Sequence, residues 1–124
     1  MKIYVAAHCR WAALHVASVL KAHGHEITSS WLGQEFQPTE MVAPNVRALI
    51  AQQDADEVAA ADALVLIAGP DRYPGGKFVE TGIALGVQNP VVVIGRRENM
   101  LMYHPAIVQV DTPEQAAVLL RELG

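Results

Sequence analysis

The chain has 124 residues, of which 52% are hydrophobic and 18% charged, and its formal net charge is −4. This length suits one domain with its own hydrophobic core, so we expect a single domain over residues 1–124. The negative charge argues against general nucleic-acid binding, which normally needs a basic face to neutralise phosphates. A small molecule is the expected ligand.

The cysteine count and the distribution of charge indicate a cellular compartment. Cys9 stands alone, so an intramolecular disulfide is excluded and a reducing environment is expected. His8, Arg10 and His15 interrupt the apolar stretch at the start of the chain before a signal-peptide core is reached. No other run is long enough to cross a bilayer. These features predict a cytoplasmic protein without a membrane partner.

Short β-rich runs alternate with helix-like segments along the chain, which is typical of an α/β protein. The predicted strands are residues 3–7, 25–28, 63–68, 91–94 and 107–110. The predicted helices are residues 10–23, 45–61, 77–87 and 113–123, with Gly24 ending the first and Asn45 capping the second. Right-handed crossovers would wind these elements into a single doubly wound, flavodoxin-like, five-stranded parallel sheet with helices on both faces.

In such a sheet, ligands bind beyond the carboxyl ends of the strands. The predicted ends are residues 7–10, 29–31, 68–76 and 95–99. Residues 29–44 contain a glycine and two prolines among polar residues, and are predicted to form a long loop that overhangs this edge.

The segment from Gly69 to Gly82 joins a predicted buried strand to a helix. Its adjacent Gly75 and Gly76 allow backbone N–H groups to approach a ligand closely at a helix N-terminus, where phosphate or a sugar hydroxyl is bound favourably. Glu80 is expected in the first turn of this helix, beside the same pocket. A glutamate there also complements the helix dipole without any chemical role, so both interpretations remain open.

A second carboxylate lies on the preceding predicted helix. Asp54 has Ile50 and Val58 at i−4 and i+4, so it shares a face with apolar residues, although Arg47 at i−7 lies on that face too. Paired carboxylates suit glycoside cleavage, in which one attacks the anomeric carbon and the other handles a proton. The alternative is an Asp54 that simply pairs with Arg47.

Five short motifs, in this order and spacing, carry a resemblance to a known family. They are Lys-Ile-Tyr-Val-Ala at residues 2–6, Gly-His-Glu-Ile-Thr-Ser-Ser-Trp-Leu at 24–32, Asp54 eight residues ahead of Asp62, Gly-Gly-Lys-Phe-Val-Glu-Thr-Gly-Ile-Ala-Leu-Gly at 75–86, and Gly-Arg-Arg-Glu-Asn at 95–99. Over nearly its whole length the chain resembles the nucleoside 2-deoxyribosyltransferases and the related nucleoside 5′-monophosphate N-glycosidases.

The resemblance implies roles for particular residues. Glu80 would be the nucleophile that forms a covalent 2-deoxyribosyl-enzyme, Asp54 would serve proton transfer and sugar contact, and Tyr4 would orient Glu80. Family members are dimers or larger, and a neighbouring subunit completes each site. Residues 99–104, through Asn99 and His104, would make that contribution.

Further substrate contacts are expected from Arg10, Trp31, Asp71, Gly75 and Gly76, with Trp31 placed to stack on a nucleobase. The transferase branch carries an acid six residues before the nucleophile, where this chain has Pro74, so the proton donor to the base is left open. No cofactor is expected. The histidines do not converge with other ligands, so no metal is expected either.

These observations predict cleavage of the N-glycosidic bond of a 2-deoxynucleoside or its 5′-monophosphate, with transfer of the sugar to another base or to water. The alternatives are a catalytically inactive nucleotide-binding or sensor domain and a purely structural interaction domain. Large apolar side chains at residues 100–103 predict a contact surface, and hence a homodimer.

Overall fold

Five parallel strands form one sheet in the order β2-β1-β3-β4-β5. The computed structural model describes residues 1–34, 38–69 and 75–124. The strands are β1 (Lys2–Ala6), β2 (Glu26–Ile27), β3 (Ala63–Ile67), β4 (Val91–Ile94) and β5 (Ile107–Val110). The predicted flavodoxin-like fold is therefore confirmed. The chain places β2 on one side of β1 and then β3, β4 and β5 on the other side, as the doubly wound topology requires.

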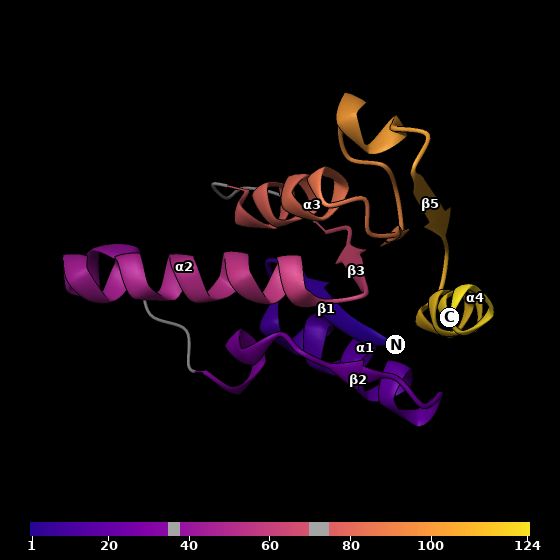
Figure 1. Ribbon diagram of the computed structural model, residues 1–124, viewed down its shortest axis with the longest axis horizontal. Helices are drawn as coiled ribbons and strands as arrows, with labels where there is room; N and C mark the ends of the chain where they lie inside the picture. The colour runs from indigo at the N-terminus through magenta and orange to yellow at the C-terminus, as the bar shows by residue number, and fades with distance from the viewer. Residues whose placement is uncertain (35–37, 70–74) are drawn as a thin grey trace.

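Helices cover both faces of the sheet (Figure 1). They are α1 (Arg10–Ala22), α2 (Pro44–Ala60), α3 (Gly76–Gly86) and α4 (Pro113–Leu123). The pair α1 and α4 packs on one face, and the pair α2 and α3 packs on the other. No helix in the described part of the chain is both long and apolar enough to cross a membrane.

The alternation of side chains along β1 divides the core in two. Ile3 and Val5 are buried against α1 and α4, whereas Tyr4 and Ala6 are buried against α2 and α3. Successive residues of a strand point to opposite faces, so a step of one residue moves a side chain from one core to the other. Tyr4 is thereby directed to the face that carries the predicted carboxylates.

Two predicted helix starts differ from the structure. The N-cap of α2 is Ala43 and makes no side-chain cap, so the prediction that Asn45 caps this helix is wrong. Pro44 occupies the first helical position instead, where its fixed φ suits the helix and its missing N–H would have had no partner. Helix α3 starts at Gly76, after Gly75 at a φ of 81°, so Glu80 is its fifth residue and lies beyond the predicted first turn.

The segment between β2 and α2 contains two short 3₁₀ helices, η1 (Ser30–Gly33) and η2 (Thr39–Met41). Strand β2 is only two residues long, and beyond its end side chains make the hydrogen bonds to β1. The N–H of Val5 donates to Oγ of Ser29 at 3.1 Å, and Nε1 of Trp31 donates to the carbonyl oxygen of Val5 at 2.9 Å. This docking brings Trp31 to the carboxyl end of the sheet.

Candidate active site

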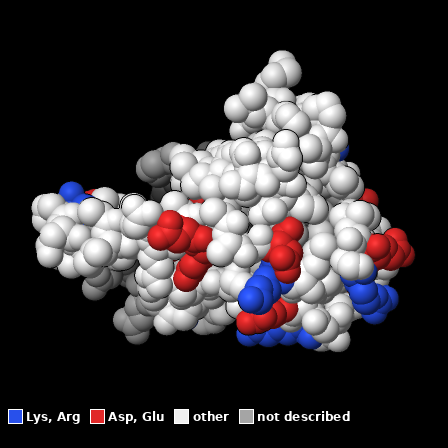
Figure 2. All heavy atoms as spheres, in the orientation of Figure 1, with Lys and Arg blue, Asp and Glu red and all other residues white. Residues whose placement is uncertain are grey.

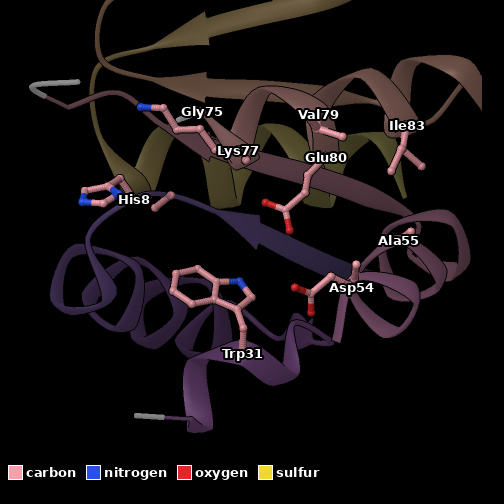
Figure 3. Close-up of a pocket in the computed structure, with 12 residues that line it drawn as sticks. His8, Trp31, Asp54, Ala55, Gly75, Lys77, Val79, Glu80 and Ile83 are labelled. Atoms are coloured by element: carbon pink, nitrogen blue, oxygen red, sulfur yellow. The ribbon is translucent and has the colours of Figure 1, made fainter. Parts of the chain in front are cut away.

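A cavity of about 510 Å³ lies at the carboxyl ends of the central strands, between α2, α3 and η1 (Figure 3). The residues that line it are Ala7, His8, Trp31, Ala51, Asp54, Ala55, Gly75, Gly76, Lys77, Val79, Glu80 and Ile83. Both predicted carboxylates are among them, together with the predicted aromatic residue and the glycine pair. The volume is in the range of small-molecule sites.

The hydroxyl of Tyr4 donates a hydrogen bond to Oε2 of Glu80. Tyr4 extends from β1 into the core below the cavity, and its side chain has no exposed surface. Burial, followed by the negative charge of Glu80, raises the pKa of Tyr4 far above its ordinary value. Tyr4 therefore stays protonated and acts as a fixed donor that orients one oxygen of the Glu80 carboxylate.

Burial raises the pKa of Glu80 to about 7. The hydrogen bond from Tyr4 lowers this pKa, while the negative charges of Asp54 and Glu57 raise it further. Glu80 therefore exchanges a proton near neutral pH, in contrast to an ordinary surface glutamate. Such tuning is typical of carboxyl groups that take part in catalysis.

Asp54 projects from α2 into the same cavity, and its carboxylate and that of Glu80 both point into the space beside Trp31 (Figure 3). Burial, followed by the charge of Glu57, raises the pKa of Asp54. Arg47 donates from Nε to the carbonyl oxygen of Val42 at 2.7 Å. Both Asp54 and Arg47 lie in the described part of the chain and form no ion pair with each other, so the alternative of a simple Asp54–Arg47 pair is wrong.

Three other residues that were predicted to contact the substrate do not line the cavity. Arg10 does not line the cavity, and its Nε donates to the carbonyl oxygen of Leu32 at 2.9 Å. Asn99 caps the 3₁₀ helix η3 (Met100–Tyr103), and His104 accepts on Nδ1 from the N–H of Ala106 at 3.0 Å. Neither belongs to this cavity, so a contribution from them would have to come from a second copy of the chain. Asp71 lies outside the described residues.

Glu57 is a charged residue near the site that the sequence did not single out. It follows Asp54 by three positions on α2, and its Oε1 accepts the N–H of Ser30 at 3.0 Å. Its charge raises the pKa of Tyr4, Asp54 and Glu80. The i, i+3 spacing from Asp54 was the signal that could have identified it.

Lys77 and Glu98 form a second feature that sequence reasoning missed. Nζ of Lys77 lies 2.7 Å from Oε1 of Glu98, and the two side chains are only 2% and 6% exposed. A lysine at the start of a helix opposes the helix dipole, which is the sequence signal for a compensating acid. The pair joins the start of α3 to the loop after β4, and so fixes the helix that carries Glu80.

The described residues contain no group of three or more His, Cys, Asp or Glu side chains that could hold a metal ion. The carboxylates of the cavity offer an oriented nucleophile or base at Glu80, and a second acid or base at Asp54. Trp31 adds an aromatic surface for a planar ligand.

No protein-family model and no curated protein matches the sequence. Solved structures do share its fold. A 2-deoxyribosyltransferase from Bacillus psychrosaccharolyticus matches with a TM-score of 0.73 and 21% identity, over 94% of this chain and 90% of that chain. The CMP N-glycosidase BcmB from Clostridium botulinum gives a TM-score of 0.63 and 11% identity, over 98% of this chain and 99% of that one.

A third structure, a conserved protein from Enterococcus faecalis V583, matches with a TM-score of 0.73 and 15% identity, over 100% of this chain and 99% of that chain. These similarities, together with the strand order, define the class: a doubly wound parallel α/β domain with a two-carboxylate cavity at its carboxyl edge. At such identities the similarity concerns the fold, and the chemistry has to be argued from the cavity.

Proposed function

We propose that the protein cleaves the N-glycosidic bond of a 2-deoxynucleoside or its 5′-monophosphate, with Glu80 as the nucleophile. The observation that carries this proposal is the Glu80 carboxylate, oriented by the buried Tyr4 hydroxyl and directed with Asp54 into one cavity. The fold shared with a 2-deoxyribosyltransferase and a CMP N-glycosidase supports the same choice of reaction.

In the proposed reaction, one oxygen of ionised Glu80 attacks the anomeric carbon of the sugar. The bond from this carbon to the base nitrogen breaks, its electron pair leaves with the base, and the base takes up a proton. The product is a covalent glycosyl ester on Glu80, which water or a second base then attacks at the same carbon, releasing the carboxylate. Asp54 serves proton transfer and contact with the sugar.

The remaining walls match the parts of such a substrate. The indole of Trp31 supplies a surface for stacking of the base, and Gly75 and Gly76 at the start of α3 present backbone N–H groups to a sugar hydroxyl or a 5′-phosphate. Residues 70–74, which include Asp71 and Pro74, lie outside the described residues.

We further propose that the protein is a homodimer in which η3 contacts the second copy and brings Asn99 or His104 to its site. Met100 is 84% exposed and Leu101 75% exposed. Figure 2 shows no charged side chain where η3 protrudes at the top of the molecule, as is typical of a contact surface. Met102, which the sequence places in this contact surface, is buried, so it does not contribute to the exposed face.

A double variant tests the assembly. Met100→Glu with Leu101→Glu should yield monomers in light scattering and lower turnover, whereas Val108→Glu, an exposed apolar position on β5, should change neither. A fully active monomer would show that each chain builds its site alone.

The reaction itself is tested by incubating the protein with each 2-deoxynucleoside and each 5′-monophosphate, with and without a free acceptor base. Release of free base from at least one compound is expected, and a new nucleoside in the presence of acceptor identifies a transferase. A 2-fluoro-2-deoxynucleoside should leave a sugar on Glu80 that is visible in the intact mass, because the fluorine slows formation and breakdown of the ester. Binding without release of base would instead identify a sensor domain.

A further inference from the structure

The tryptophan that lines the cavity belongs to a segment with little structure of its own. Helix η1 is a 3₁₀ helix of four residues, and such short helices have poor hydrogen-bond geometry and depend on tertiary contacts. Its contacts with the sheet come from side chains, because β2 ends at Ile27 and leaves Val5 without a strand partner on that side. The indole N–H of Trp31 fills this position.

Two charged side chains hold the backbone on either side of Trp31. From α2, Oε1 of Glu57 accepts the N–H of Ser30 at 3.0 Å. From α1, Nε of Arg10 donates to the carbonyl oxygen of Leu32 at 2.9 Å. Both are hydrogen bonds with one ionised partner, the stronger class, and they reach the residues immediately before and after Trp31 from opposite helices.

We propose that Arg10 and Glu57 are positioning residues that clamp η1 and hold Trp31 as a preformed wall for a planar base. Neither side chain lines the cavity, so each holds the indole through the backbone that carries it. Glu57 acts on the carboxylates of the site through its charge as well. A wall fixed before binding lowers the ordering cost of association, so the clamp strengthens ligand binding. The identity of the planar ligand rests on the proposed function, whereas the clamp does not.

The clamp also explains why Arg10 follows the first strand at the edge of the site without reaching into it. The sequence predicts a substrate contact from Arg10 because of its position after β1. The structure instead gives its Nε a backbone carbonyl as partner.

The test uses the fluorescence of Trp31. The chain has two tryptophans, and Trp11→Phe leaves Trp31 as the sole tryptophan, which is excited selectively at wavelengths that tyrosine does not absorb. The change should not disturb the core, because Trp11 is 77% exposed. In this background Glu57→Ala and Arg10→Ala should each raise the quenching constant for acrylamide. Loss of one such hydrogen bond should increase about tenfold the fraction of molecules in which η1 and Trp31 are detached from the sheet.

Matched variants separate the clamp from general destabilisation. Glu57→Gln keeps an oxygen that accepts the Ser30 N–H, and Arg10→Gln keeps an N–H donor, so both should restore most of the protection of Trp31. Arg121→Ala and Glu122→Ala, exposed positions on α4, should leave quenching unchanged. Circular dichroism verifies that every variant is folded. The proposal is overturned if the acrylamide quenching constants of Glu57→Ala and Arg10→Ala equal that of the Trp11→Phe parent.

Turnover provides the second readout. On the 2-deoxynucleoside that the substrate panel identifies, Glu57→Ala should raise KM about threefold to tenfold relative to Glu57→Gln, which loses the same charge but keeps the hydrogen-bond acceptor. The effect on kcat should be smaller, because a looser wall weakens binding. Glu57→Gln should keep KM close to that of the parent protein. If no compound is turned over, the proposed function fails while the quenching series still decides the clamp. If turnover occurs but KM is equal in Glu57→Ala and Glu57→Gln, the clamp does not serve substrate binding.

Discussion

The two faces of the sheet differ in what they bury. On the face covered by α1 and α4, most buried residues are apolar and include alanines on both helices that let the helices pack closely, such as Ala13, Ala17, Ala116 and Ala117. His25 is the exception that the structure shows there, and its Nε2 lies 2.9 Å from the carbonyl oxygen of Ala117. On the other face, α2 is 17 residues long and fully buries only Val58. Its first half extends beyond the sheet in Figure 1.

This second face also carries a cluster of ionisable side chains around the cavity. Tyr4 is completely buried there, its hydroxyl contacts Glu80, and Asp54 and Glu57 lie close enough to affect the pKa of both groups. Buried carboxyl groups cost stability, since burial disfavours their charged form. The comparison shows that one face mainly stabilises the fold, whereas the other face carries ionisable groups that lower stability and are placed for chemistry.

The largest expected effect comes from the second face. Glu80→Ala should lower kcat by at least about 10³-fold, because it removes the proposed nucleophile. Glu114→Ala is the matched control, as Glu114 is an exposed first-turn carboxylate of α4. Turnover and thermal unfolding are measured on both variants. A Glu80→Ala protein that keeps full activity would remove the proposed chemical distinction between the faces.

The opposite face should respond in stability and leave catalysis alone. Leu20 on α1 has no exposed surface, so Leu20→Ala should lower the free energy of unfolding by about 2–5 kcal/mol through the lost apolar contacts and the resulting cavity. Urea titration measures this loss, with Leu123→Ala as the exposed control. Well below the unfolding transition, kcat and KM should stay unchanged. A large fall in kcat would show that the faces are coupled.

Tyr4→Phe tests the hydrogen bond between the buried Tyr4 hydroxyl and the Glu80 carboxylate. Without the hydroxyl, kcat/KM should fall about 10-fold to 100-fold, the range for a hydrogen bond to a charged group. Because that bond lowers the pKa of Glu80, its loss should raise this pKa above about 7 and move the acidic limb of the kcat/KM profile to higher pH. An unmoved limb would contradict the orienting role of Tyr4.

The smallest effect concerns stability as a function of pH. Glu80 has a pKa of about 7 in the fold against an ordinary value of 4.5, so between these values the folded protein binds more protons than the unfolded chain. Its contribution to stability is present below about pH 4.5 and is lost as the pH rises through about 7. Glu80→Gln lacks this loss, so its melting temperature relative to that of the parent protein should rise from pH 5 to pH 8. A constant difference would show that Glu80 titrates normally.

Much of the fold follows from local sequence. The strand at 91–94 and the helix at 113–123 are confirmed with their predicted bounds, because the first is a continuous apolar run and the second begins with a Thr112 cap and Pro113. The start of α2 was misplaced because a proline at the first helical position made the cap at Asn45 unnecessary. Both cases concern interactions within a few residues.

The site could be predicted only in part. Glu80, Asp54 and Trp31 were predicted as site residues and do line one cavity, while their chemical roles stay predictions. Glu57 was missed because its partner is a backbone N–H 27 residues away, at Ser30. Asn99 and His104 lie outside the cavity of their own chain, so any role for them depends on a second copy.

By itself, the sequence determined the alternation of strands and helices and the edge of the sheet where polar residues gather, since periodicity and turn residues act over short distances. Only the tertiary structure decided that Arg10 turns to the carbonyl of Leu32, and that Tyr4 meets Glu80, 76 positions later, in a contact that the family resemblance implied but no local pattern predicted. The physical reason is that the pKa of a carboxyl group and the partner of a guanidinium are set by neighbours in space. The chain brings those neighbours together only when the sheet has formed.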